Sequence, residues 1–249
     1  MFAMLLAGYG MSLAVSEPSI AGEGQPPETH RSWTGFYVGG FAGYKHAEVN
    51  PSLTLEGSWI PSDAIVVEAR AGEDLTDDGA ELGGLIGYNH QWSDWVLGLE
   101  ASAGYLWLRD SEQSEDIRPP STNQFFVSRS FKTHYLVTAG PRVGYAFCDW
   151  LPYATAGLAI GDLDFSQDLA AFDYFTTPTG GSKSQTRVGW FVGGGLQYAL
   201  SDHWSMRAQY EYIDLGHVQF HTDFRSDYPV RNEAKLKEQN ASLAIIYAF

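Results

Sequence analysis

The sequence predicts an all-β fold, and three observations support this prediction. Gly accounts for 27 of the 249 residues and aromatic residues for 14% of them, a mixture that favours strands and turns over helices. Long segments alternate apolar with small or polar side chains at a period of two, which puts each kind on one face of a strand. Short and long connections then alternate along the chain. Together these features predict an eight-stranded antiparallel up-and-down β-barrel.

The segments before the barrel predict an export signal and a linker. Residues 1–16 are mostly apolar and carry no charge, and the small residues Ala14 and Ser16 fit a cleavage site of a signal peptide or its remnant. A basic stretch that usually begins such a signal is missing, so an ordinary frayed tail is the alternative. Residues 17–32, rich in Pro, Gly and Glu, predict a flexible linker. The barrel is then expected over 33–249.

Eight segments carry the alternating pattern. In 204–214, for example, Trp204 and Met206 lie on an apolar face, whereas Arg207 and Glu211 lie on the polar face. An even number of strands allows a closed antiparallel barrel to keep both termini at one end. The predicted strands cover 35–48, 80–92, 95–109, 132–147, 151–164, 186–200, 204–214 and 236–249.

The connections predict that this barrel spans a membrane. Those after the second, fourth and sixth strands hold only a few residues, whereas the other four are long and cover 49–79, 110–131, 165–185 and 215–235. This alternation is typical of outer-membrane barrels, which have short periplasmic turns and long extracellular loops. Hydrocarbon cannot satisfy exposed backbone groups, so a β protein crosses a bilayer only as a closed barrel with apolar residues outside. We therefore expect a barrel in the bacterial outer membrane.

Aromatic residues gather at both ends of the predicted strands, as expected at the two membrane interfaces. A soluble lipocalin-like carrier also has eight strands, but it would place its aromatics inside. We single out six interface residues: Trp92, Trp95, Trp107, Trp190, Trp204 and Tyr247. The wider set comprises Phe147, Tyr153, Tyr198 and Phe249 at the short-turn end, with Tyr44, Tyr105, Tyr135 and Tyr212 nearer the long loops.

Several motifs resemble those of one protein family. WTGFYVGGFAGY (33–44), GGLIGYN (83–89), PRVGYAF with WLPYATAGLA (141–159) and VGWFVGGGLQYALSDHWSMRAQYEYIDLG (188–216) are similar to the small porin-like, immunogenic outer-membrane proteins of alphaproteobacteria, in the OmpA-like barrel superfamily. The resemblance covers nearly everything after residue 33 except the long loops. It implies an eight-stranded outer-membrane barrel. It also implies that the barrel-assembly machinery recognises the terminal Phe249 through the last strand.

The predicted lumen contains charges that should pair. Glu100, Arg142, Arg207 and Glu211 all point inward by alternation. Eight strands enclose a space that side chains fill, and an unpaired buried charge costs several kcal/mol. We expect these four residues to form an ion-pair network that plugs the barrel, with a gate or ion path as the alternative. At lumen positions that are commonly polar in the family, this chain has Phe41, Leu85 and Gln197. A drier lumen with fewer charges disfavours a pore that conducts ions.

Charge and motif spacing disfavour other classes of function. The 30 acidic residues against 15 basic ones argue against a nucleic-acid partner. None of the seven histidines shows a Ser/His/acid spacing suited to nucleophilic catalysis, so we predict no catalytic residue, no cofactor and no enzyme. His217 and His221 are candidates to share a metal, but a solvated loop beside Asp223 is the preferred interpretation, and we name no metal site.

The acidic residues concentrate in the predicted external loops. Over 49–78, 110–130, 165–184 and 215–234 there are 16 Asp and Glu against 6 Lys and Arg, which gives −10 of the net −15. Such a surface suits divalent-cation bridges to lipopolysaccharide or a host or environmental ligand, and simple solubility is the alternative. The sequence therefore predicts a structural and surface-interaction protein of the outer membrane. A narrow, weakly cation-preferring porin is the second candidate.

Overall fold

The computed structural model describes residues 31–55, 57, 61–71, 75–108, 111–118, 125–171, 179–223 and 229–249. The predicted signal and nearly all of the predicted linker lie outside these residues. In the described part of the chain, no helix is long and apolar enough to cross a membrane. The elements are β1 (Gly35–Leu55), α1 (Pro61–Ala71), β2 (Leu75–Trp92), β3 (Trp95–Leu108), β4 (Ser111–Ile117), β5 (Phe125–Lys132), β6 (Tyr135–Tyr145), β7 (Trp150–Ala171), β8 (Thr179–Ala199), β9 (Trp204–Asp223) and β10 (Pro229–Ala248).

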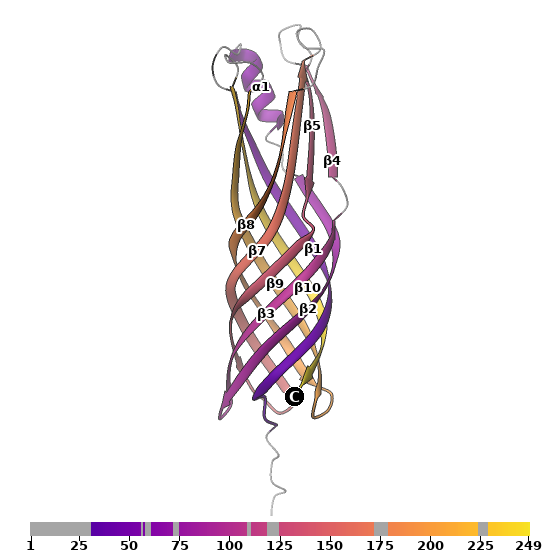
Figure 1. The fold of residues 1–249 in the computed structure, drawn as a ribbon, viewed down its shortest axis with the longest axis vertical. Coiled ribbons are helices and arrows are strands. Elements are labelled where there is room, and N and C mark those ends of the chain that lie inside the picture. Colours follow the sequence, from indigo (N-terminus) through magenta and orange to yellow (C-terminus); the bar gives the residue numbers. More distant parts are fainter. Residues whose placement is uncertain are drawn as a thin grey trace, which may run out of the picture. The chain divides into compact units, whose positions relative to one another are not determined.

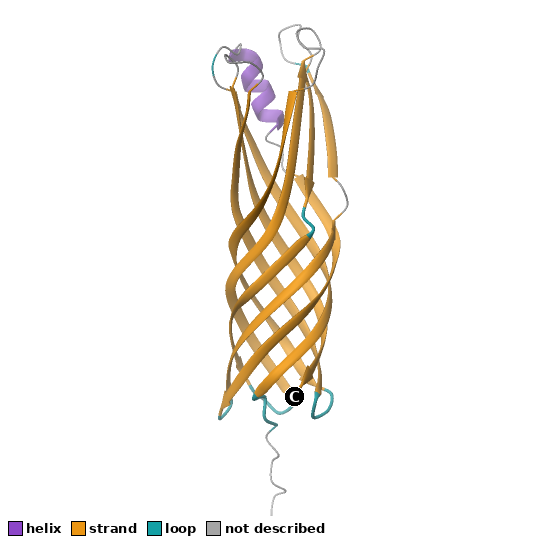
Figure 2. Cartoon of the chain, viewed as in Figure 1, coloured by secondary structure: helices purple, strands orange, loops and turns teal. Residues whose placement is uncertain are grey.

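Eight of these strands close into an antiparallel barrel (Figures 1 and 2). Their order around the barrel is β1, β2, β3, β6, β7, β8, β9 and β10, and the pairing of β10 with β1 closes the ring. The remaining two strands form a hairpin in which β4 pairs with β5 and β5 pairs with the outer part of β7. The predicted eight-stranded up-and-down barrel is confirmed.

The strands run far beyond the length that a bilayer requires. A membrane-spanning strand needs about 9–11 residues, whereas β7 has 22 and β1 and β8 have 21 each. The prediction that 49–79, 110–131, 165–185 and 215–235 are loops is wrong for most of the described residues there, which are strand or belong to α1. Apolar residues at every second position are needed only where a strand faces lipid. A strand that continues beyond the lipid keeps its backbone pairing without that pattern.

The ring of paired strands is interrupted between β8 and β9 toward the end with the long connections. The β8–β9 pairing stops at Trp190↔Asp214, although each strand continues to pair with its other neighbour. At that level Gly216 has a φ of 77°, a left-handed conformation that glycine adopts without strain, and the β9–β10 register shifts. Beyond it the extension therefore consists of two separate sheets, one around β7 and one around β10.

The inner and outer faces of the barrel have opposite chemistry. Lipid-facing positions carry exposed apolar side chains such as Leu99, Leu158 and Leu243, each more than 60% exposed. The lumen instead contains charged side chains, with an apolar cluster at each end and a third cluster, which includes Phe41 and Leu85, packed among the charges. The cluster at the short-turn end comprises Trp33, Val96, Leu151 and Ala199. The outer cluster comprises Ala47, Val49, Leu106, Leu136, Ala159, Phe191, Ile213, Leu215 and Leu236.

Candidate functional site: the charged lumen

The first lumen cluster, which we call the arginine network, joins strands β1, β3, β6 and β9 through Glu100. Arg207 Nη1 lies 2.9 Å from Glu100 Oε1 and 2.8 Å from Oε2, and Arg142 Nη1 lies 3.0 Å from Oε2. The Tyr37 hydroxyl donates to the same oxygen at 2.6 Å. Both arginines are almost fully buried. One carboxylate therefore holds two guanidinium groups from different strands.

Aromatic and amide side chains complete the arginine network. The Arg142 guanidinium carbon lies 4.0 Å from the centre of the Tyr153 ring, a cation–π arrangement, and Arg142 Nη2 donates to Gln197 Oε1 at 3.2 Å. Tyr153 was expected among the interface aromatics. That prediction is wrong, because Tyr153 is 7% exposed inside the lumen and its hydroxyl donates to Gln209.

Glycines make room for the bulky lumen side chains. A Cβ atom added to Gly87 on β2 would lie 2.3 Å from the Tyr37 ring, which is closer than such atoms can approach. The Tyr37 ring therefore lies across the glycine backbone of the neighbouring strand, where its hydroxyl reaches Glu100. The glycine content that predicted strands and turns thus also shapes the lumen.

A second cluster, the lysine network, lies further along the lumen and was not predicted. Lys45 Nζ lies 3.0 Å from Glu238 Oε2 and 3.7 Å from Glu81 Oε1, and Asn240 Nδ2 donates to Glu81 Oε2 at 2.7 Å. All four side chains are at most 3% exposed. The same alternation that placed Phe41 in the lumen also places Lys45 there, so the signal was present in the sequence.

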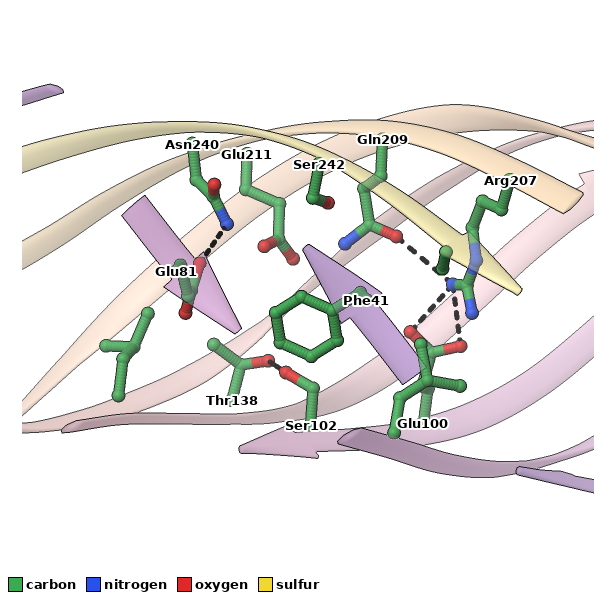
Figure 3. Close-up of a pocket in the computed structure, with 13 residues that line it drawn as sticks. Phe41, Glu81, Glu100, Ser102, Thr138, Arg207, Gln209, Glu211, Asn240 and Ser242 are labelled. Carbon is green, nitrogen blue, oxygen red and sulfur yellow. Dashed lines mark hydrogen bonds and ion pairs between the residues drawn. The ribbon is translucent and has the colours of Figure 1, made fainter. Parts of the chain in front are cut away.

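Glu211 lies apart from the arginines with which we expected it to pair. It is 6% exposed and faces the lumen, opposite Asn240 in the strand register. No hydrogen bond or ion pair links it to Arg142 or Arg207 among the described residues, and Figure 3 shows it beside Asn240 and Ser242. It lines a cavity of about 20 Å³ between the two networks, which is room for about one water molecule.

The six interface aromatics lie on the outer face of the barrel. The five tryptophans are 49–63% exposed, and Tyr247 contacts the ring of Trp204 at a centroid distance of 5.1 Å. Trp92, Trp95, Trp204 and Tyr247 are near the short turns, and Trp107 and Trp190 are near the opposite end of the lipid-facing band. Phe249 follows β10, is 74% exposed, and donates its backbone N–H to the Phe36 carbonyl at 3.0 Å.

Strand geometry disfavours the two histidines considered as a shared metal site. His217 and His221 both belong to β9, where we had expected a loop. Residues four apart along a strand are about 13 Å apart, too far to share one ion. Within the described residues, the group of side chains that does converge is His134, Asp162 and Asp164, on the outer face.

A closed antiparallel barrel with an apolar outer face and a polar lumen defines the class of integral outer-membrane barrels. The family model for the outer membrane protein beta-barrel domain matches residues 7–249, and the chain belongs to this family. The expected outer-membrane localisation and the resemblance to alphaproteobacterial outer-membrane proteins are confirmed.

Outer-membrane proteins of Brucella match most of this chain and are themselves covered over about four fifths of their length. The 31 kDa outer-membrane immunogenic protein of Brucella melitensis is 31% identical over 210 residues, covering 82% of this chain and 79% of that protein. The 25 kDa outer-membrane immunogenic protein of Brucella abortus is 27% identical over 218 residues, covering 88% and 80%. The solved structure of OprG from Pseudomonas aeruginosa is 12% identical, with a TM-score of 0.47, over 89% of this chain and 98% of that one.

Proposed function

We propose that this outer-membrane barrel has a structural and surface-interaction role, with a lumen plugged by side chains and no catalytic activity. The observation that carries the proposal is the pair of buried ion networks beneath the outer apolar cluster. Arg207, Lys45 and Glu238 are at most 1% exposed, so charged groups here bind one another rather than lining a water-filled path. The outer cluster adds an apolar layer across the same lumen, which opposes the passage of ions.

The narrow porin is the competing function, and conductance separates the two. Purified protein inserted in planar bilayers should give no stepwise conductance in concentrated KCl. A porin of known conductance, inserted under the same conditions, is the positive control. Regular conductance steps from the wild-type protein would contradict a plugged lumen and favour the porin.

We further propose that the outer end contacts lipopolysaccharide or a host or environmental ligand through acidic side chains. Support comes from carboxylates at the border of the apolar band, including Asp78 on β2 and Asp162 on β7. Carboxylates contact lipid phosphates through divalent cations, because direct contact would be repulsive. Binding of purified lipopolysaccharide should therefore require a divalent cation and fall on chelation. Equal binding with and without chelator would argue against this contact.

We also propose that the barrel-assembly machinery recognises the last strand. The position of Phe249 supports it, because its ring is exposed at the end of β10 and contacts Tyr247 at a centroid distance of 5.3 Å. An exposed terminal ring is accessible to another protein before the barrel closes.

A further inference from the structure

A histidine and two aspartates converge at the outer border of the lipid-facing band. Along the outward face of β7, Leu158 and Ile160 are followed by Asp162 and Asp164, so the strand changes there from apolar to acidic. His134, between β5 and β6, reaches the same place from the neighbouring strand. This border is the level at which lipid headgroups meet the barrel.

The three side chains are spaced as ligands of one metal ion. His134 Nδ1 lies 2.9 Å from Asp162 Oδ2 and 3.8 Å from Asp164 Oδ2, and one ligand atom from each side chain lies within 4.8 Å of the others. Zinc binds nitrogen and oxygen at roughly 2.0–2.2 Å, so tetrahedral ligand atoms stand about 3.4 Å apart. Both histidine–aspartate distances lie within about half an ångström of that spacing, and the two carboxylates lie no more than 4.8 Å apart.

The backbone already holds one of the three ligands, Asp162, in place. The chain bulges before β6, where His134 and Tyr135 are both outward and exposed. Their backbone N–H groups each donate to Asp162 Oδ1 at 2.9 Å. This fixes the carboxylate and leaves its second oxygen directed at the imidazole, which is how supporting hydrogen bonds orient metal ligands.

Asp164 provides an observation that the bulge does not explain. It accepts neither of the backbone hydrogen bonds that hold Asp162, yet its carboxylate lies near the same imidazole. Its Oδ1 atom is inaccessible to solvent and has no hydrogen-bond partner among the described residues, although the side chain as a whole is 40% exposed. Two carboxylates two residues apart on one strand face repel each other, and a cation between them removes that cost.

We propose that His134, Asp162 and Asp164 form a binding site for a divalent transition-metal ion, with Zn²⁺ or Mn²⁺ as the class expected. An imidazole ligand favours such ions over Mg²⁺ and Ca²⁺, which prefer all-oxygen sites. Three protein ligands leave at least one coordination position for an outside group. At this level of the membrane that group is a phosphate oxygen, a part of the inference that rests on the proposed surface function.

Metal titration of the full chain in detergent tests the site. Isothermal titration with Zn²⁺ should show one site per barrel, and His134→Ala and Asp164→Asn should each weaken binding about tenfold or more. The matched control is His46→Ala, because His46 pairs with Asp78 at 2.6 Å but has no third ligand in the described part of the chain. Its binding should equal that of the wild type.

Two results would overturn the metal site. One is the absence of Zn²⁺ and Mn²⁺ binding by the wild type, and the other is unchanged binding in both variants of the site. In either case the imidazole serves only as the hydrogen-bond partner of Asp162. Folding of each variant is checked by the mobility shift on boiling in SDS, so a loss of binding is not confused with a loss of structure.

A second measurement separates the ion from its phosphate partner. The barrel is placed in micelles of a maltoside detergent, which contains no phosphate, with and without purified lipopolysaccharide, and Zn²⁺ affinity is measured in both. A higher affinity with lipopolysaccharide, absent in Asp164→Asn, supports the phosphate contact. Equal affinities would reject that contact and weaken the proposed surface function, while the metal site itself would stand.

Discussion

Replacing Glu100 by Gln tests whether the arginine network holds the barrel together. The carboxylate faces two guanidinium groups at 2.8–3.0 Å and accepts the Tyr37 hydroxyl at 2.6 Å. A neutral amide of the same size would leave both arginines without a counter-charge. Arg142 would keep Gln197 and Arg207 would keep Gln209, so part of the hydrogen bonding survives. Breaking a buried ion pair by removing one partner costs about 3–5 kcal/mol.

Urea unfolding of the barrel in lipid vesicles, followed by tryptophan fluorescence, measures this cost. Glu100→Gln should lower the free energy of unfolding by about 3–5 kcal/mol. Glu211→Gln is the matched control, because it is the same change in the same lumen without an arginine ion pair. It should be neutral or stabilising, since it removes a buried charge that those arginines do not offset. Equal losses in the two variants would refute the view that Glu100 anchors the arginines.

Three further changes probe the lysine network, the glycine packing and the terminal residue. Lys45→Met should cost about 3–5 kcal/mol in the same unfolding assay, because it leaves Glu81 and Glu238 buried together without their cation; a loss below about 1 kcal/mol would contradict the network. Gly87→Ala should cost about 1–3 kcal/mol through its clash with Tyr37, and an unchanged stability would contradict that packing. Phe249→Ala should reduce the amount of barrel assembled in cells but leave the refolded protein as stable as the wild type, and normal assembly would contradict its role as a signal.

The sequence predicted the part of the barrel that lipid contacts. Trp204, Met206 and Tyr210 alternate with Arg207 and Glu211, and the structure places the two sets on opposite faces. The prediction was correct here because lipid outside the barrel and packed polar side chains inside it require residues of opposite character at alternate positions. The extension beyond the membrane follows no such demand, so its strands were read as loops.

The pattern in the sequence predicts the position of Tyr153, whereas the contact between His134 and Asp162 is beyond prediction from a single sequence. Alternation along the strands places both Tyr153 and Lys45 in the lumen. The aromatic character of Tyr153, taken alone, instead suggests a position at the membrane interface. Along β7, Tyr153 lies on the same face as Thr155, which is buried. The contact between His134 and Asp162 depends instead on a bulge and on the register of two strands, and neither leaves a mark in a single sequence.

The buried charges also bear on how the barrel closes in one register. Apolar burial alone specifies a membrane barrel poorly, because apolar residues are acceptable on both of its faces. A slip of one residue between neighbouring strands would turn lumen side chains such as Lys45 and Glu238 toward lipid. A charge is destabilising there, by roughly 2–4 kcal/mol for Lys or Arg at the midplane and by less for Asp or Glu and near the interfaces. These two residues are 193 positions apart and lie on β1 and β10, the strands whose pairing closes the ring. We infer that the lysine network fixes the register of this last pairing, which explains why charges occupy a lumen that apolar side chains could fill.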